Sequence, residues 1–390
     1  ILAKAVSPWA GHWFEYGGGG TVWDSVVYDP ELDQLYIGVG NGSPWPLALR
    51  SDGKGDNLFL GSIVALDPDT GRYLWHYQET PGDSWDFTSS QQITLATLKL
   101  GGSERRVILH APKNGFFYVI DRSTGKLISA RNYVPVTWAD GVDPTTGRPR
   151  VRPEARYPEK PFLMIPSSTG AHNWPPMSYS PLTGLVYIPA MQAPTVMAPN
   201  PDFHFLPRGW NIGTRHPGPS GFDMPPRWGA LIAWDPVAQK EAWRAPQVDY
   251  WNGGTLATAG NVVFEGTATG EFDAYDATNG RKLWRYAVDT AILAGPISYS
   301  IGNEQFVAVM AGSGGFYGLF EKVPGQAEHA PPAGRLLVFK LAGKAKLDRV
   351  ERPLPPANPP ADTFTADQVT KGRRLYFDGC FRCHAGHILP

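Results

Sequence analysis

The chain has 390 residues and a formal net charge of −1 at pH 7, with no block of basic or acidic residues and no run of eighteen apolar residues. The charge balance argues against nucleic acid as the main partner, and the lack of a long apolar run argues against a transmembrane helix. Gly and Pro (44 and 38 residues) make up about a fifth of the chain, beside 14 Trp, 16 Tyr and 18 Phe. This composition suits many short strands joined by tight turns.

One pattern recurs along the chain: alternating apolar residues, an Asp, a turn that usually ends at Gly, and often a Trp on the next strand. The copies cover 63–75, 117–125, 231–243 and 272–284, with the Asp at Asp67, Asp121, Asp235 and Asp276. Each copy predicts a β-hairpin, and complementary hairpins are predicted at 26–38, 177–188 and 262–266. Two hairpins make a four-stranded sheet, and the spacing of the last two copies is that of a propeller blade.

We therefore predict an all-β fold, an incomplete β-propeller of five or six blades over residues 1–345. The repeated Trp is expected to pack between neighbouring blades. A β-sandwich is the rival architecture, although it would not need a recurrent motif. Residues 44–58, 131–170 and 198–228 are expected to be loop insertions between strands.

The repeats end before a segment of different composition. Residues 346–362 are predicted to form a semi-rigid linker, because the stretch 352–361 is rich in Pro. Thr365 and Gln368 then form a predicted capping box, which opens a helix that runs through Tyr376.

The string Cys380-x-x-Cys383-His384 follows this helix, and it is the attachment signature of a c-type haem. Two thiols can form thioethers to one haem, and the adjacent imidazole can ligate the iron. Residues 363–390 are therefore interpreted as the start of an α-helical cytochrome c domain. A chance surface motif and a thioredoxin-like redox motif are the alternatives. Because covalent haem attachment normally takes place outside the cytoplasm, we expect a periplasmic protein, and we expect this sequence to be a piece of a longer chain.

Four strings in the first third of the chain carry residue types suited to a flat aromatic cofactor and a hard cation. Trp23 follows the run Gly17–Gly20, so an indole face stands beside glycines that let the backbone approach closely. Asn41 offers a side-chain oxygen suited to Ca²⁺, and Asp86 offers a carboxylate that can take a proton. Lys113 offers a cation that can stabilise negative charge. A core Trp after a turn, an Asn-Gly turn and a solvated Lys are the purely structural alternatives.

With this order of parts, the chain resembles the quinohaemoprotein alcohol dehydrogenases, which have an eight-bladed propeller that binds pyrroloquinoline quinone (PQQ) and a C-terminal cytochrome c domain. The resemblance covers essentially the whole sequence. It implies a role for each string: quinone stacking for Trp23, calcium ligation for Asn41, proton abstraction and calcium ligation for Asp86, and hydrogen bonding to the quinone oxygens for Lys113. It further implies that cofactor-lining loops carry Asn173, Trp174, Trp251 and Asn252.

Three more positions refine the comparison with this family. Thr88 occupies the place where lanthanide-using relatives have a second carboxylate, which favours calcium here. Asp83, the neighbouring candidate for the base, is interpreted as a turn residue. Ser313 occupies a place where relatives commonly have Trp, which leaves the shape of the pocket wall and the substrate range open. A calcium-binding Glu, a vicinal disulfide and the sixth haem ligand are expected outside this sequence.

The resemblance implies oxidation of alcohols to aldehydes or ketones with PQQ, Ca²⁺ and haem c. Electrons would pass through the haem at His384 to a cytochrome, a blue copper protein or a quinone. This piece alone is expected to be inactive. The alternatives are a non-catalytic propeller–cytochrome module that binds or assembles other proteins, and a dehydrogenase of the same class that acts on a bulky cyclic or polymeric alcohol.

Overall fold

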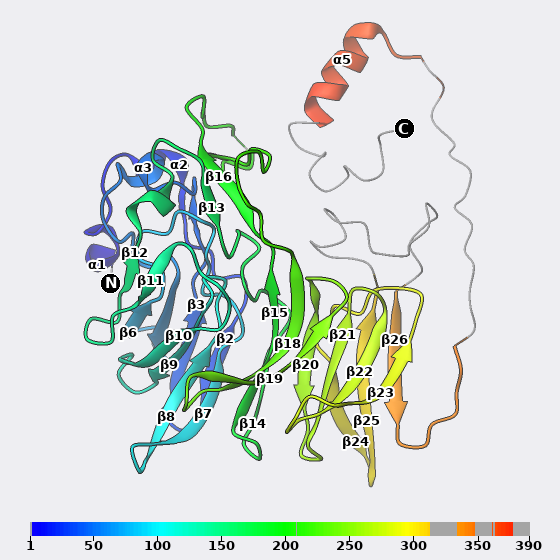
Figure 1. Ribbon diagram of the computed structural model, residues 1–390. Helices are drawn as coiled ribbons and strands as arrows, with labels where there is room; N and C mark the ends of the chain where they lie inside the picture. The colour runs from blue at the N-terminus through cyan, green and yellow to red at the C-terminus, as the bar shows by residue number, and fades with distance from the viewer. Residues whose placement is uncertain (1, 208, 313–333, 348–360, 362, 377–390) are drawn as a thin grey trace.

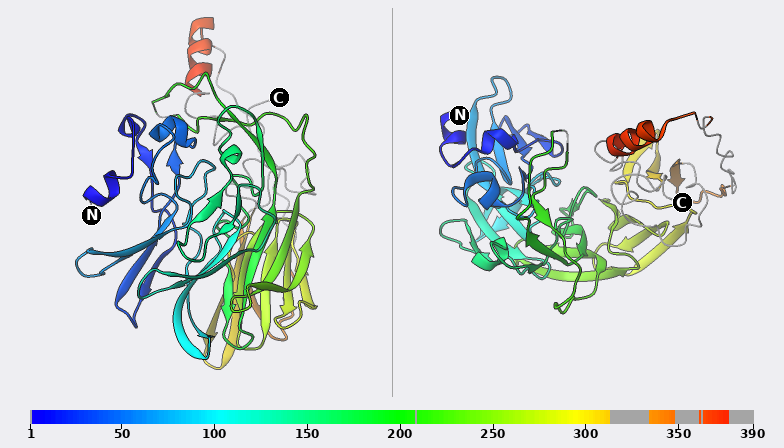
Figure 2. Two further views of the ribbon diagram at one scale, coloured as in Figure 1. Left: turned by 60° about the vertical axis from the view of Figure 1, so that its left-hand side comes forward. Right: turned by 90° about the horizontal axis from the view of Figure 1, so that it is seen from above.

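The computed structural model describes residues 2–207, 209–312, 334–347, 361 and 363–376. Five antiparallel sheets follow one another in chain order, and we call them blades 1 to 5 (Figure 1). Seen from above, they lie along an open arc that runs from the blue strands to the yellow ones (Figure 2). The structure therefore has the mostly-β, blade-by-blade organisation predicted from the repeats.

Each blade is a meander in which strands that follow one another within the sheet pair antiparallel. Blade 1 contains β2 (Val26–Asp29), β3 (Gln34–Gly38), β5 (Ser62–Leu66) and β6 (Tyr73–Gln78), and blade 2 contains β7 (Thr94–Leu100), β8 (Ser103–His110), β9 (Phe116–Asp121) and β10 (Leu127–Asn132). Blade 3 contains β14 (Ser178–Ser180), β15 (Leu185–Gln192), β18 (Trp228–Asp235) and β19 (Lys240–Gln247), and blade 4 contains β20 (Asn252–Ala257), β21 (Val262–Thr267), β22 (Glu271–Asp276) and β23 (Lys282–Ala287). The described part of blade 5 contains β24 (Ile297–Ile301), β25 (Glu304–Ala311) and β26 (Arg335–Lys340).

The burial of each strand follows its place in the blade. β5 and β9 are inner strands of their sheets, and nearly all of their residues are buried. Continuous apolar sequence is what such strands require. The outer strand β6 instead alternates, and it buries Trp75 and Tyr77 while the residues between them are partly exposed. In blade 1, the two kinds of sequence thus distinguish the inner strand from the outer one.

The recurrent Asp and Gly close the hairpin between the third and fourth strands. In blade 1, Asp67 Oδ1 accepts hydrogen bonds from the Thr70 backbone N–H at 3.0 Å and from the Thr70 hydroxyl at 2.8 Å. Gly71 has a φ of 67°, a left-handed conformation that suits Gly, and its N–H donates to the Asp67 carbonyl at 2.9 Å. The same closure occurs at Asp121 and Asp276.

The recurrent Trp packs between blades, as predicted. Trp75 of blade 1 lies against the turn glycine Gly125 of blade 2, where an added Cβ would stand 2.4 Å from the indole Cε3. Trp243 of blade 3 lies in the same way against Gly280 of blade 4, and its indole N–H donates to the Ala277 carbonyl at 3.1 Å. The motif therefore supplies both halves of the contact, an indole from one blade and a bare turn from the next.

The stretches expected to be loop insertions contain more regular structure than predicted. They hold α3 (Leu47–Ser51), the hairpin β11 (Ala139–Val142) and β12 (Pro149–Val151), the 3₁₀ helix η1 (Pro153–Arg156) and the sheet of β13 (Phe162–Met164), β16 (Thr195–Pro199) and β17 (Thr214–Arg215). The prediction missed that sheet because its strands come from segments far apart in sequence. Nearer the N-terminus lie α1 (Leu2–Val6), α2 (Trp13–Tyr16) and the pair β1 (Gly18–Gly19) and β4 (Gly42–Ser43).

Helix α5 (Ala366–Leu375) begins as predicted. The Thr365 hydroxyl oxygen accepts from the Gln368 backbone N–H at 3.2 Å, and the Gln368 side chain accepts from the Thr365 N–H at 2.9 Å. Cys380, Cys383 and His384 lie outside the described residues, as do Ser313 and most of the predicted linker, so the haem motif stays a prediction.

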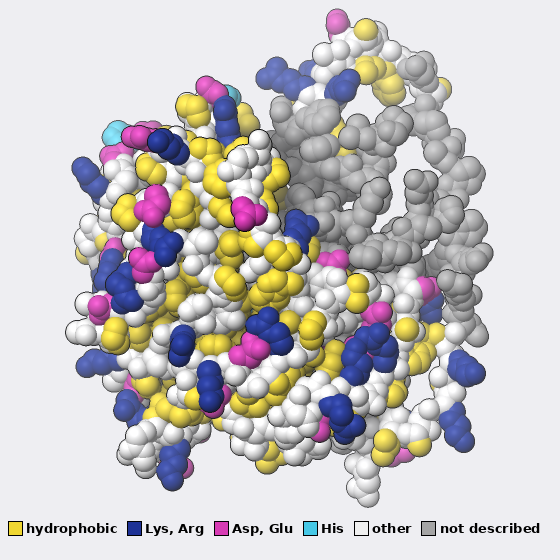
Figure 3. All heavy atoms as spheres, in the orientation of Figure 1, with side chains coloured by type: hydrophobic (Ala, Val, Ile, Leu, Met, Phe, Trp, Pro, Cys, Tyr) yellow, Lys and Arg dark blue, Asp and Glu magenta, His cyan; other side chains and the backbone are white. Residues whose placement is uncertain are grey.

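The described surface shows no field of a single charge sign on the face drawn in Figure 3, where basic and acidic side chains are interspersed. This mixture agrees with the net charge of −1. Among the described residues, no helix is long and apolar enough to cross a membrane.

Candidate active site

Asp86 lies in the connection between blades 1 and 2, in a turn built by its own neighbours. Its φ is 68°, a left-handed conformation that is uncommon for a residue with a side chain. The buried Asp83 Oδ1 accepts from the backbone N–H groups of Trp85 at 3.0 Å and Phe87 at 3.1 Å, on either side of Asp86. Both aromatic side chains are fully buried. Asp83 is therefore the turn residue that the sequence predicts, and it holds the peptide groups next to Asp86.

Asp86 forms an ion pair with Lys113, the second candidate from the sequence. Lys113 Nζ lies 2.9 Å from Asp86 Oδ2 and 3.2 Å from the Asp86 carbonyl oxygen. The side chains of Lys113 and Asp86 are 7% and 20% exposed, respectively. Burial raises the pKa of Asp86, and the Lys113 ammonium only partly offsets this effect. A carboxylate with a raised pKa is a stronger base, which is the property that proton abstraction requires.

The loop that carries Lys113 is packed tightly against a second loop. Lys113 lies between β8 and β9, and the Ala171 N–H donates to its carbonyl at 3.0 Å. An added Cβ at Gly170 would stand 2.5 Å from Lys113 Cγ, so the glycine backbone crosses directly over the lysine stem. His172 is buried, and its Nδ1 lies 2.6 Å from the Ala111 carbonyl. These contacts place Asn173 and Trp174 close to the lysine loop.

Trp23 and Asn41 are brought together by the glycine run. Strands β1 and β4 pair with Gly18 opposite Ser43 and Gly19 opposite Gly42, and the Gly20 N–H donates to the Asn41 carbonyl at 2.9 Å. An added Cβ at Gly40 would stand 3.3 Å from Trp23 Nε1. The segment before Asn41 also runs beside the one after Asp86, since the Ser89 N–H donates to the Val39 carbonyl at 3.1 Å.

Three of the predicted cofactor-lining tryptophans form a continuous aromatic group. The ring centroids of Trp23 and Trp174 are 6.0 Å apart at an interplanar angle of 65°, and those of Trp174 and Trp251 are 5.3 Å apart at 44°. Trp23 and Trp174 are 41% and 36% exposed, whereas Trp251 is buried. Trp23 and Trp174 therefore keep part of their side-chain surface exposed.

The two predicted asparagines are buried beside these rings. Asn173 Nδ2 donates to the Thr169 carbonyl at 2.9 Å, and its Oδ1 accepts from Gln91 at 3.4 Å. Asn252 Nδ2 donates to the Asp249 carbonyl at 2.9 Å, while its Oδ1 has no hydrogen-bond partner among the described residues. A buried acceptor without a partner is costly unless a ligand supplies the donor.

These residues fit PQQ well and Ca²⁺ only in part. Exposed indoles, a lysine ammonium and a buried unpaired amide oxygen suit a flat, polar-edged quinone. Asn41 and Asp86 offer oxygen ligands, but Ca²⁺ takes six to eight. The described part of the chain contains no group of three or more His, Cys, Asp or Glu side chains able to hold a metal ion. The two side chains could therefore supply only part of a calcium shell.

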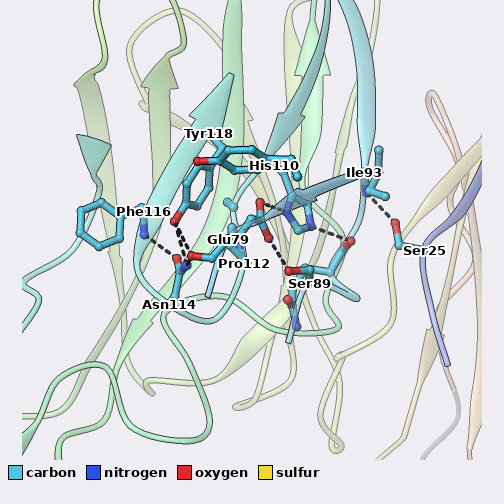
Figure 4. Close-up of polar contacts among 12 residues, drawn as sticks. Ser25, Glu79, Ser89, Ile93, His110, Pro112, Asn114, Phe116 and Tyr118 are labelled. Carbon is cyan, nitrogen blue, oxygen red and sulfur yellow. Dashed lines mark hydrogen bonds and ion pairs between the residues drawn. The ribbon is translucent and has the colours of Figure 1, made fainter. Parts of the chain in front are cut away.

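Sequence reasoning missed a buried polar network beneath the Asp86 and Lys113 loops (Figure 4). Glu79 is 1% exposed, and its Oε1 lies 2.8 Å from Nδ1 of the buried His110. Its Oε2 accepts from the Ser89 hydroxyl at 2.6 Å. The only signal in the sequence is a Glu directly after the apolar alternation of β6, a position at which exposure is the ordinary expectation.

Comparison with known proteins agrees with this geometry. The family described as the glucose/ethanol/alcohol dehydrogenase β-propeller domain, a PQQ family, matches residues 3–147 and 223–307. Quinohemoprotein alcohol dehydrogenase ADH IIB of Pseudomonas putida is 48% identical over 407 residues, which cover 100% of this chain and 58% of that protein. The chain belongs to the PQQ-dependent quinohaemoprotein alcohol dehydrogenase family. The quinohemoprotein alcohol dehydrogenase of Comamonas testosteroni is 46% identical over 98% of this chain and 55% of that protein.

The crystal structure of the Comamonas testosteroni enzyme matches this fold with a TM-score of 0.85 over 98% of this chain and 57% of the other. A europium-containing methanol dehydrogenase matches with a TM-score of 0.73 and 33% identity, over 80% of this chain and 54% of that chain. The chain thus spans a little more than half the length of these relatives. Family membership supports the recognition of PQQ and of an alcohol dehydrogenase scaffold; the individual site roles stay predictions.

Proposed function

We propose that the protein oxidises alcohols to aldehydes or ketones in a reaction that depends on PQQ and Ca²⁺, with Asp86 as the general base. The observation that carries this proposal is the ion pair of Asp86 and Lys113 at 2.9 Å, a partly exposed carboxylate held by a nearly buried cation. A scaffold protein that only binds partners has no reason to keep Trp23, Asn41, Asp86 and Lys113 together.

The candidate side chains would have different roles in the reaction. Bound PQQ would supply the two-electron acceptor for the hydride that leaves the alcohol carbon. Asp86 would take the hydroxyl proton of the alcohol, and Lys113 would stabilise negative charge on the cofactor oxygens. The exposed faces of Trp23 and Trp174 would orient the ring by stacking.

Calcium is the metal that we propose for this site, with Asn41 and Asp86 among its ligands. Thr88 is buried, and its Oγ1 accepts from Gln91 Nε2 at 2.9 Å. A hydroxyl that is already hydrogen-bonded adds no negative charge. A trivalent lanthanide favours more anionic ligands than a divalent ion, so Thr88 at this position supports calcium.

We further propose that a haem c attached at Cys380 and Cys383, with His384 as an iron ligand, receives the electrons from the quinone. The Pro-rich linker would keep this transfer intramolecular, and haem attachment implies a periplasmic location. The names of two relatives suggest acceptors: "Alcohol dehydrogenase (quinone), dehydrogenase subunit" and "1-butanol dehydrogenase (cytochrome c)". A quinone or a cytochrome is therefore the proposed downstream acceptor, with a blue copper protein as a further possibility.

The test uses the natural full-length protein and dye-linked oxidation of primary, secondary and cyclic alcohols, with and without added PQQ and Ca²⁺. Asp86→Asn keeps the size of the side chain and removes the base, and Asp69→Asn, at an exposed turn position, is the matched control. We expect activity that needs both additions, is lost in Asp86→Asn and is kept in Asp69→Asn. A protein that carries haem but neither binds PQQ nor oxidises any of these alcohols would instead support the non-catalytic module.

A further inference from the structure

Glu79 and His110 form a buried, hydrogen-bonded pair of ionisable side chains that takes no part in the chemistry proposed above. Both side chains are almost completely inaccessible, and every oxygen and nitrogen of the two functional groups has a partner. Resting on the proposed function, we propose that this pair, together with Ser89, is a positioning unit that fixes Asp86 and Lys113 relative to each other.

The hydrogen-bond pattern shows that a proton lies between Glu79 and His110. His110 Nε2 lies 3.0 Å from the Gln91 carbonyl, which can only accept, so Nε2 carries a hydrogen. Nδ1 lies 2.8 Å from Glu79 Oε1. Two bare acceptors at this distance would repel each other, so a second hydrogen is shared between them. One of the two atoms therefore donates and the other accepts, and the hydrogen bond ties the two side chains together.

The pair connects the two segments that carry the reacting side chains. Ser89 lies three positions after Asp86 and donates its hydroxyl to Glu79 Oε2 at 2.6 Å. His110 lies three positions before Lys113 at the end of β8. A displacement of either segment would therefore break a contact in the network, and Figure 4 shows the Ser89 and His110 side chains meeting at the one Glu79 carboxylate.

Three further hydrogen bonds hold the segments on either side of this unit. Asn114, next to Lys113, donates from Nδ2 to the Thr80 hydroxyl at 3.2 Å and to the Tyr118 hydroxyl at 2.9 Å. The Ile93 N–H donates to the Ser25 hydroxyl at 2.7 Å, which ties the end of the Asp86 segment to the Trp23 segment. The base, the lysine and the stacking tryptophan thus belong to segments that share one buried framework.

A comparison within the protein shows that burial alone does not produce this arrangement. Glu265 is equally buried, but its Oε1 has no hydrogen-bond partner among the described residues and its Oε2 accepts from Gln247. Ser90, beside Ser89, is also fully buried, yet its hydroxyl has no partner in the described structure. Ser90 is therefore a matched control for Ser89, with the same burial and segment but no contact with Glu79.

The experiment compares Ser89→Ala with Ser90→Ala in the full-length protein loaded with PQQ and Ca²⁺. The readouts are kcat, KM for the alcohol, thermal unfolding, and the Kd of PQQ for the apoprotein from quenching of tryptophan fluorescence. Because a misplacement of about 1 Å can cost about a hundredfold in rate, we expect kcat to fall at least about tenfold in Ser89→Ala, with KM changed less than about twofold. PQQ binding should weaken in Ser89→Ala, and Ser90→Ala should match the wild type.

Glu79→Gln tests whether the hydrogen-bond geometry or the ionisable carboxyl group of Glu79 is responsible for the positions of Asp86 and Lys113. The amide introduced by Glu79→Gln can donate to a neutral His110 Nδ1 and accept from Ser89, so both contacts survive without the charge. We expect kcat and PQQ affinity within about threefold of the wild type. A folded Glu79→Gln protein that has lost tenfold in kcat would overturn the positioning role, and this variant decides the matter even if Ser89→Ala does not fold.

The outcomes separate this inference from the function on which it rests. If the wild type oxidises alcohols and Ser89→Ala behaves like Ser90→Ala in both kcat and PQQ affinity, the positioning role is wrong and the proposed function stands. If the wild type itself neither binds PQQ nor oxidises alcohols, the proposed function fails, and the inference fails with it.

Discussion

Gly170→Ala should displace the lysine loop without replacing any of the proposed functional side chains. Gly170 has a φ of 86°, and its backbone crosses the stem of Lys113. An added Cβ would stand 2.5 Å from Lys113 Cγ and 2.8 Å from its Cα, where ordinary contacts begin at 3.4 Å. Because one of these neighbours is the backbone atom Cα, rotation of the side chain cannot relieve the overlap. The lysine loop, the Gly170 loop or both must move by about 0.9 Å at the closest contact, the difference between those two distances.

Gly170→Ala should have two effects, a backbone cost and a displacement of Lys113, and a control variant can separate them. Alanine at a positive φ costs about 1–2 kcal/mol wherever it occurs. Gly184 has a φ of 70° and nothing within 4 Å of its added Cβ, so Gly184→Ala carries the backbone cost alone. Gly170→Ala adds the displacement of Lys113 from Asp86. A shift near 1 Å in a reacting group can lower the rate by about a hundredfold.

The assay compares both variants by thermal unfolding, by alcohol oxidation with saturating PQQ and Ca²⁺, and by the Kd of PQQ for the apoprotein. We expect Gly184→Ala to lose stability but keep kcat, and Gly170→Ala to lose about ten- to a hundredfold in kcat and to bind PQQ more weakly. If the two variants lose similar stability and keep the same kcat, the Gly170 contact does not hold Lys113 in its working position.

Two further substitutions test the framework around the site. Burial raises the pKa of Asp83 to about 6, with Arg50 opposing this rise, so the folded protein keeps a proton that the unfolded chain loses near pH 4. The stability supplied by Asp83 should therefore be present below about pH 4 and fall by at most about 3 kcal/mol as the pH rises from about 4 to about 6, with no further loss above that range. Denaturant unfolding from pH 4 to 7 should show a decline of that size in the wild type relative to Asp83→Asn, and parallel curves would contradict it. Gly125→Ala would bring a Cβ to 2.4 Å from the Trp75 indole at a φ of 70°, and should cost about 2–5 kcal/mol in calorimetry. A loss no larger than that of Gly184→Ala would show that Trp75 can move away freely.

The repeats predicted the blades because their signal is local. A run such as Ile63–Leu66, an Asp-to-Gly turn and a Trp two positions into the next strand specify a hairpin without reference to the rest of the chain. The same local logic identified the capping box at Thr365. The sheet of β13, β16 and β17 was not predictable in this way, because its strands pair across distant segments and their sequences are short and irregular.

The candidate site also has features that the sequence could predict and features that only the fold shows. Trp23, Asn41, Asp86 and Lys113 could be proposed because their local strings resemble those of the quinohaemoprotein alcohol dehydrogenases, and because each side chain has the chemistry that its implied role requires. The sequence could not show that Asp86 and Lys113 form an ion pair, nor that the Asp86 segment is held by Asp83 and by Glu79. Those contacts join blades and loops, and only the tertiary structure decides them.

The sequence by itself determined the kind of strand and the turn chemistry, because these depend on neighbours within a few residues. Only the tertiary structure decided which buried polar groups meet. Glu79 and His110 lie far apart in the chain and are read locally as ordinary surface residues, yet folding removes both from water. Because desolvated charges must find partners, their pairing depends on how neighbouring blades bring the segments together.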